Sequence, residues 1–101
     1  MSEHLLTLSG TVTIRERIAI PPGAVATVKV VDAQGEVLAA TAVEATGVPV
    51  SWTVTIDPAT VADESRLQVW AALRTDVGWW GTLDLAPVAR GLDIVLTRVP
   101  D

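Results

Sequence analysis

Few side chains in this 101-residue sequence are of the kinds that perform catalysis or bind metal ions. The one histidine, His4, lies near a terminus that is expected to fray, so we interpret it as a surface residue. Asp57, Asp63 and Glu64 could hold Ca²⁺ weakly, but they lack the alternating ligands of an EF-hand loop, which favours solvated acids. We find no Ser–His–Asp set, phosphate-binding loop or dinucleotide motif. The sequence therefore predicts no enzyme, no cofactor and no metal site.

The tryptophans and one arginine are the candidate binding residues. Trp52 alternates with valines, which predicts a place in the core, whereas Trp70 shares a polar face with Gln68 and Arg74. In the strand expected at 79–85, Trp80 is in phase with the polar residues at 82 and 84, so we expect Trp80 on the outer face as well. Exposed Trp70 and Trp80, with Arg74, could contact a partner, a second copy or a sugar. Alternatively, they pack on each other or on the arginine stem.

The segment "RERIAIPPG" combines a charge cluster with a rigid turn. If the first strand keeps its register, Glu16 points inward, and a lone buried carboxylate is costly. Either a bulge turns Glu16 outward, or Arg74 or Arg98 pairs with it. Pro22 and Gly23 suit the two central positions of a type II turn, where glycine accepts a positive φ. We therefore assign structural roles to Glu16, Pro22, Gly23 and the core residue Trp52.

These residues must be positioned by strands, because seven short segments rich in Val, Ile, Thr and Trp alternate between apolar and polar side chains. They cover residues 5–14, 24–32, 36–45, 49–57, 66–74, 79–85 and 91–99. This spacing predicts one all-β domain over residues 1–101, ordered over about 5–99. We expect an antiparallel β-sandwich of seven to eight strands. A helical turn with Asp57 as its cap is the one expected break.

Charge and hydropathy limit the choice of partners. The net charge is −5 and the pI about 4.6, which argues against a nucleic-acid partner. There is no apolar run of the roughly 18–20 residues that a membrane span needs. The sequence contains no cysteine, hence no disulfide, thiolate zinc site or lipobox, and it shows no signal peptide. As written, the chain is expected to be cytoplasmic.

Three segments resemble a known family. "LSGTVTIRERIAIPPGAVATVKVVD", "VPVSWTVTIDPATV" and "LDIVLTRV" are similar to the YbaY/YscW-type lipoproteins, and residues 15–25 are the most specific part. The resemblance implies a small β-sandwich without catalysis, in the bacterial envelope. It also implies kinship with the pilotins of type III secretion, which bind a secretin subunit and help it to assemble.

Two functions follow as expectations. The first is a non-enzymatic module that binds or helps to assemble another protein, or that self-associates. The second is a small-ligand or carbohydrate-binding module that uses Trp70 and Trp80. Neither expectation includes a nucleic-acid partner or a transmembrane span.

Overall fold

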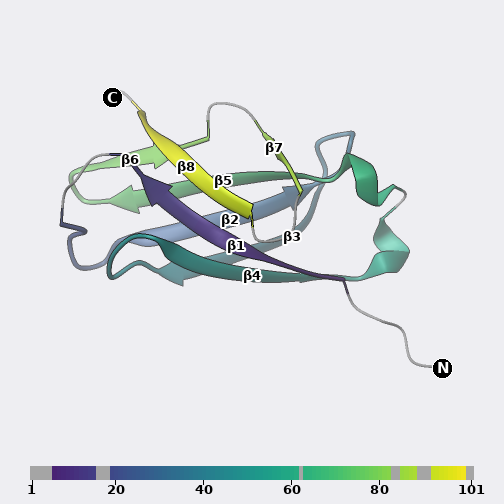
Figure 1. The fold of residues 1–101 in the computed structure, drawn as a ribbon, viewed down its shortest axis with the longest axis horizontal. Coiled ribbons are helices and arrows are strands. Elements are labelled where there is room, and N and C mark those ends of the chain that lie inside the picture. Colours follow the sequence, from purple (N-terminus) through teal and green to yellow (C-terminus); the bar gives the residue numbers. More distant parts are fainter. Residues whose placement is uncertain (1–5, 16–18, 62, 83–84, 89–91, 100–101) are drawn as a thin grey trace.

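The structure is a computed structural model that describes residues 6–15, 19–61, 63–82, 85–88 and 92–99 (Figure 1). Within these residues the chain is all-β, as predicted, with only two single-turn 3₁₀ helices. The strands are β1 (Leu6–Ile14), β2 (Val25–Val31), β3 (Val37–Glu44), β4 (Val50–Ile56), β5 (Gln68–Thr75), β6 (Gly78–Gly81), β7 (Ala86–Pro87) and β8 (Leu92–Val99). The 3₁₀ helices are η1 (Pro58–Thr60) and η2 (Glu64–Arg66). Neither helix has the length or the apolarity to span a bilayer.

The strands form one continuous sheet, which corrects the expected sandwich of two sheets. The main path runs β3-β2-β5-β6-β8-β1-β4, and β7 pairs with β5. Strand β8 joins the two halves, because residues 92–96 pair in parallel with β1 and residues 97–99 pair antiparallel with β6. The sheet thus curls into a nearly closed barrel with β3 and β4 at its two ends (Figure 1). One strand pair is parallel, so the fold is not purely antiparallel either.

The interior is filled by the apolar residues of each alternating strand. In β4 the residues at 50, 52, 54 and 56 are buried, while Ser51, Thr53 and Thr55 are exposed. Trp52 is 3% exposed, so its predicted place in the core is confirmed. Among the described residues none of polar or charged type is buried as a whole. Burial of apolar surface, at about 25 cal/mol per Å², is therefore the main stabilising contribution inside the barrel.

Gly10 makes room for Trp52. The two residues are opposite each other in the β1–β4 ladder, and Gly10 also pairs with Leu92 of β8. A Cβ atom on Gly10 would overlap the carbonyl oxygen of Leu92 and would lie 2.9 Å from Cζ2 of Trp52. Only glycine therefore lets the indole and β8 approach β1 this closely.

The two turns predicted from the sequence, at Pro22-Gly23 and at Asp57, are present, and a further turn joins β2 to β3. Gly23 has a φ of 84°, close to the roughly +80° of the third position of a type II turn, and Pro22 precedes it. Between β2 and β3 the amide of Gly35 donates to the carbonyl oxygen of Asp32 at 3.0 Å. The Asp57 carboxylate caps η1 by accepting from the amide of Ala59 at 2.9 Å.

The structure describes only part of the charged segment around Glu16. Glu16 lies outside the described residues, as do His4 and its neighbours, so the choice between a bulge and an arginine pair for Glu16 stays open. Arg98, one of the two expected partners, donates from Nη2 to the carbonyl oxygen of Val77 at 3.1 Å.

Candidate partner-binding site

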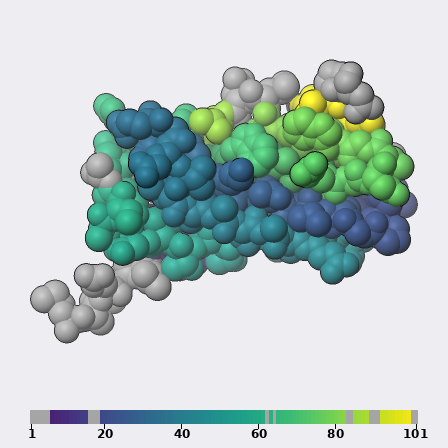
Figure 2. Space-filling view, turned by 180° about the vertical axis from the view of Figure 1, so that it is seen from behind, coloured from purple at the N-terminus to yellow at the C-terminus, as the bar shows by residue number. Residues whose placement is uncertain are grey.

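The outer face of β2, β5 and β6 carries two of the predicted site residues. Strand β5 alternates, so that Val69, Ala71 and Leu73 are fully buried inside the barrel. Trp70, Ala72 and Arg74 consequently lie on the outer face, with Trp70 half-buried and Arg74 exposed. Figure 2 shows this face, on which β5 and β6 (green) lie beside β2 and β3 (blue). The prediction that Trp70 and Arg74 share an outer face is confirmed.

Trp80 does not lie on this face, which corrects the prediction. It is 1% exposed, pairs with Leu73 of β5 and belongs to the core cluster, and the Arg98 guanidinium covers its ring at 5.0 Å from the centroid. Its neighbour Trp79 is the outer residue and is 39% exposed. A carbohydrate platform made of Trp70 and Trp80 therefore does not exist.

The error came from assuming one unbroken strand over 79–85. Strand β6 ends at Gly81, so the alternation assumed over residues 79–85 is interrupted, and Leu85 is 39% exposed. The hydroxyl oxygen of Thr82 is itself buried, so the polarity of this residue did not mark the outer face. The glycines of "GWWG" indicate a short strand, because a glycine within a strand pattern often marks a bulge or an interruption of the strand.

Trp79 and Trp70 flank a recess of about 330 Å³ that is lined by Trp70, Ala72, Arg74 and Trp79. We call it the outer recess. The bottom of the recess is formed by Ala72, which is paired with Gly81 of β6. These two small residues lie between the indoles and leave the space above them open. The Trp79 ring leans over Gly81, where an added Cβ would lie 3.3 Å from Cζ3 of the indole. Trp79 was not among the site residues expected from the sequence.

Two cations border the outer recess. Arg74 is paired with Trp79 on one side and with Val25 on the other. Lys29 is paired with Trp70, and its Nζ lies 5.1 Å from the centroid of the indole, within cation–π distance. Within the described part of the chain the only ion pair joins Arg66 and Asp63, so no described carboxylate lies within 4.0 Å of Arg74 or Lys29.

The outer recess is locally basic in an acidic protein. The outward residues of β2, β5 and β6 near it are Val25, Thr27, Lys29, Trp70, Ala72, Arg74, Trp79 and Gly81, and none is acidic. Two exposed acids lie at its margin: Glu44 of β3, which is separated from Arg74 by Val25, and Asp76, which follows Arg74 by two residues in the turn between β5 and β6. Although the whole chain has a net charge of −5, Arg74 and Lys29 let this face attract an anionic group while its indoles contact apolar surface.

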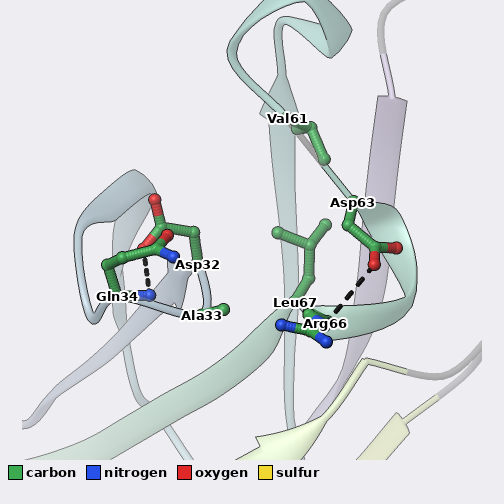
Figure 3. Close-up of a pocket in the computed structure, with 7 residues that line it drawn as sticks. All are labelled: Asp32, Ala33, Gln34, Val61, Asp63, Arg66 and Leu67. Atoms are coloured by element: carbon green, nitrogen blue, oxygen red, sulfur yellow. Dashed lines mark hydrogen bonds and ion pairs between the residues drawn. The ribbon is translucent and has the colours of Figure 1, made fainter.

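A second, smaller recess lies at the end of the barrel where the β2–β3 turn faces η2 (Figure 3). Its polar groups are occupied locally. Asp32 accepts from the amides of Gln34 and Glu36, both at 2.9 Å. Asp63 accepts from the amide of Ser65 at 3.0 Å and from its hydroxyl at 2.6 Å, and it lies 3.6 Å from Nε of Arg66. These two hydrogen bonds from Ser65, with Arg66, hold the pKa of Asp63 below its ordinary value.

The acids that were considered for Ca²⁺ serve local turns. Asp57 caps η1 and Asp63 is bound to Ser65, while the side chain of Glu64 lies outside the described residues. In the described ranges no three His, Cys, Asp or Glu residues are grouped closely enough to hold a metal ion. The outer recess is therefore the better candidate for a functional site.

Comparisons with known proteins relate the chain to a family of secretion proteins. The chain matches, over residues 3–91, a family model described as "Type III secretion system lipoprotein chaperone (YscW)". Its fold is similar to the solved structure of an alternative pilotin from the type II secretion system of Vibrio cholerae, with a TM-score of 0.86. That alignment covers 97% of this chain and 100% of the other at 24% identity, so it speaks for the fold alone. A search of curated proteins found no match.

The family model confirms the resemblance seen in the sequence. It covers most of the chain, including β1 to β7, and the family is one of secretion chaperones, not a class of enzymes. The chain belongs to the YscW family of type III secretion system lipoprotein chaperones.

Proposed function

We propose that the protein is a secretion chaperone of the bacterial envelope, which binds a secretin subunit and assists its assembly. The observation that carries this proposal is the family match over residues 3–91. The likeness in fold to a pilotin, over 97% of the chain, supports it.

The surface of the protein suits such a role. The outer recess combines partly exposed aromatic side chains with an arginine, the residue types that are enriched at protein–protein contacts. By contrast, the second recess has its carboxylates engaged in its own turns. The outer face of β2, β5 and β6 is therefore the surface that we assign to the partner.

Binding is tested with the purified chain and the secretin subunit encoded in the same genome. We expect a complex of defined stoichiometry in size-exclusion chromatography, and a dissociation constant measurable by isothermal titration calorimetry. In cells that lack the protein, we expect less assembled secretin in the outer-membrane fraction, restored when the gene is supplied again.

The control is an unrelated outer-membrane protein from the same cells, whose amount should not change. The proposal is contradicted if the purified proteins do not bind each other and if secretin assembly is the same with and without the chaperone. A chain that associates only with itself would likewise contradict it.

A further inference from the structure

We propose that the outer recess binds an acidic segment of a protein partner. In this arrangement a bulky apolar side chain lies between the indoles of Trp70 and Trp79, and a neighbouring carboxylate pairs with Arg74. The inference rests on the proposed function only for the identity of the natural partner, because the chemistry of the recess can be tested with peptides.

The shape of the recess fits a side chain. Its volume of about 330 Å³ is at the lower end of the range for ligand pockets, roughly 300–1,000 Å³. Ala72 is 2% exposed although it is on the outer face, because larger side chains surround it. A ligand group that enters between the indoles therefore contacts the two rings above a small apolar floor, which favours a bulky apolar side chain.

The positive charge of Arg74 favours a carboxylate next to the apolar side chain of the ligand. Arg74 is exposed, and its row of the sheet contains Val25 on one side and Trp79 on the other. Both neighbours are large apolar residues that are more than a third exposed. A carboxylate on Arg74 would thus form its two hydrogen bonds next to apolar surface, where charge-assisted pairs are stronger than in open water. Lys29 adds a second positive charge beside Trp70.

An acidic peptide suits this chain better than a membrane or a sugar. The net charge of −5 disfavours approach to anionic lipid, while a short acidic segment needs only the local charges of Arg74 and Lys29. A neutral sugar would offer no carboxylate to pair with Arg74. Alternation of apolar and acidic residues in the ligand matches the alternation of indoles and cations on the face.

The test uses a capped hexapeptide of alternating leucine and glutamate, and a matched peptide with glutamine in place of each glutamate. Binding is followed by NMR through the indole N–H signals of the ¹⁵N-labelled chain. We expect the acidic peptide to shift the signals of Trp70 and Trp79 but not those of the buried Trp52 and Trp80. We expect the amide peptide to bind about three- to tenfold more weakly, as for a partly exposed arginine–carboxylate pair.

Two variants isolate the arginine. Arg74→Gln should remove the preference for the acidic peptide, whereas Arg66→Gln removes the same charge from another exposed position and should leave the preference unchanged. Equal binding of the two peptides to the wild-type chain would overturn the proposal. So would shifts at Trp52 or Trp80, or the absence of any shift at millimolar peptide.

Other occupants give different results. Shifts of Trp70 and Trp79 on simple dilution of the chain would identify a second copy as the occupant. Shifts with maltose, or with phosphatidylglycerol vesicles but not with the acidic peptide, would point to a sugar or to lipid. Each of these outcomes overturns the inference. A chain that binds the acidic peptide but no secretin subunit would instead contradict only the proposed function.

Discussion

The four tryptophans form two pairs that lie on opposite sides of the same sheet. Trp52 and Trp80 are buried at 3% and 1% exposure, and neighbouring groups cover both: Trp52 occupies the space opposite Gly10, and Arg98 covers Trp80. Trp70 and Trp79 lie outside and flank the outer recess, which Arg74 also lines. Trp79 and Trp80 are adjacent in sequence, so the difference is due to the side of the strand alone. Inside, the indole stabilises the fold; outside, it is available to a partner.

The largest difference between the pairs should be in stability. Trp80→Ala removes a fully buried side chain and leaves a cavity, so we expect the free energy of unfolding to fall by about 3–5 kcal/mol. Trp79→Ala, one residue away, should cost about 1 kcal/mol or less, because its side chain is partly exposed. Chemical denaturation of both variants measures the contrast. Similar losses in the two variants would mean that the division into inner and outer tryptophans is wrong.

The next test concerns the fit of Trp52 against Gly10. In Gly10→Ala the new methyl group meets the Leu92 carbonyl oxygen and the Trp52 ring, so β1 and β8 must separate, at an expected cost of about 1–3 kcal/mol. Gly47→Ala is the matched control, since no atom lies within 4 Å of its added Cβ and its φ is not positive. Melting temperatures compare the two. If they are equal, the interior is less tightly packed than we infer.

A smaller effect should come from the turn that precedes β2. Gly23 has open space around it, so Gly23→Val meets no clash, but its φ of 84° is unfavourable for a β-branched residue. We expect a loss of about 1–2 kcal/mol. Gly23→Asn should lose less, because asparagine tolerates this conformation better. A melting temperature of the valine variant equal to that of the wild type would contradict the assigned turn.

The smallest expected effect concerns Asp63, whose carboxylate is bound within the second recess, whereas the cations of the outer recess have no described carboxylate within 4.0 Å. The pKa of Asp63 is below its ordinary value, because Ser65 and Arg66 favour the ionised carboxylate. Its contribution to stability is therefore present above the unfolded-state pKa and is lost as the pH falls through the lower, folded-state pKa. An NMR titration should show Asp63 ionising below the ordinary range for aspartate, and Ser65→Ala should raise its pKa. An ordinary value in the wild type would show that this end of the barrel does not hold its acid in place.

Local features of the fold could be predicted from the sequence because they depend on neighbours along the chain. The alternation in β4 placed Trp52 inside, the Asp57 cap starts η1, and Pro22-Gly23 forms the expected turn. These depend on a period of two residues or on a single backbone conformation.

Two other features could not be predicted because they depend on which strands meet. The parallel pairing of β8 with β1 links the two halves into one sheet, and no pattern within either strand encodes it. Likewise, Trp79 and Trp80 could be assigned to faces only by knowing that β6 ends at Gly81. The outer recess was therefore half predicted: Trp70 and Arg74 were identified, and Trp79 took the place of Trp80.

Oxidative footprinting of the four indoles, with and without the secretin subunit, tests our central claim most directly. The claim is that Trp52 and Trp80 stabilise the fold, whereas Trp70 and Trp79 contact the partner. In the chain alone we expect hydroxyl radicals to oxidise Trp79 and Trp70, and to leave Trp52 and Trp80 almost unmodified. When the subunit binds, Trp79 and Trp70 should become protected. If the subunit binds while both outer indoles remain as reactive as before, the partner uses another surface and our assignment of the site is wrong.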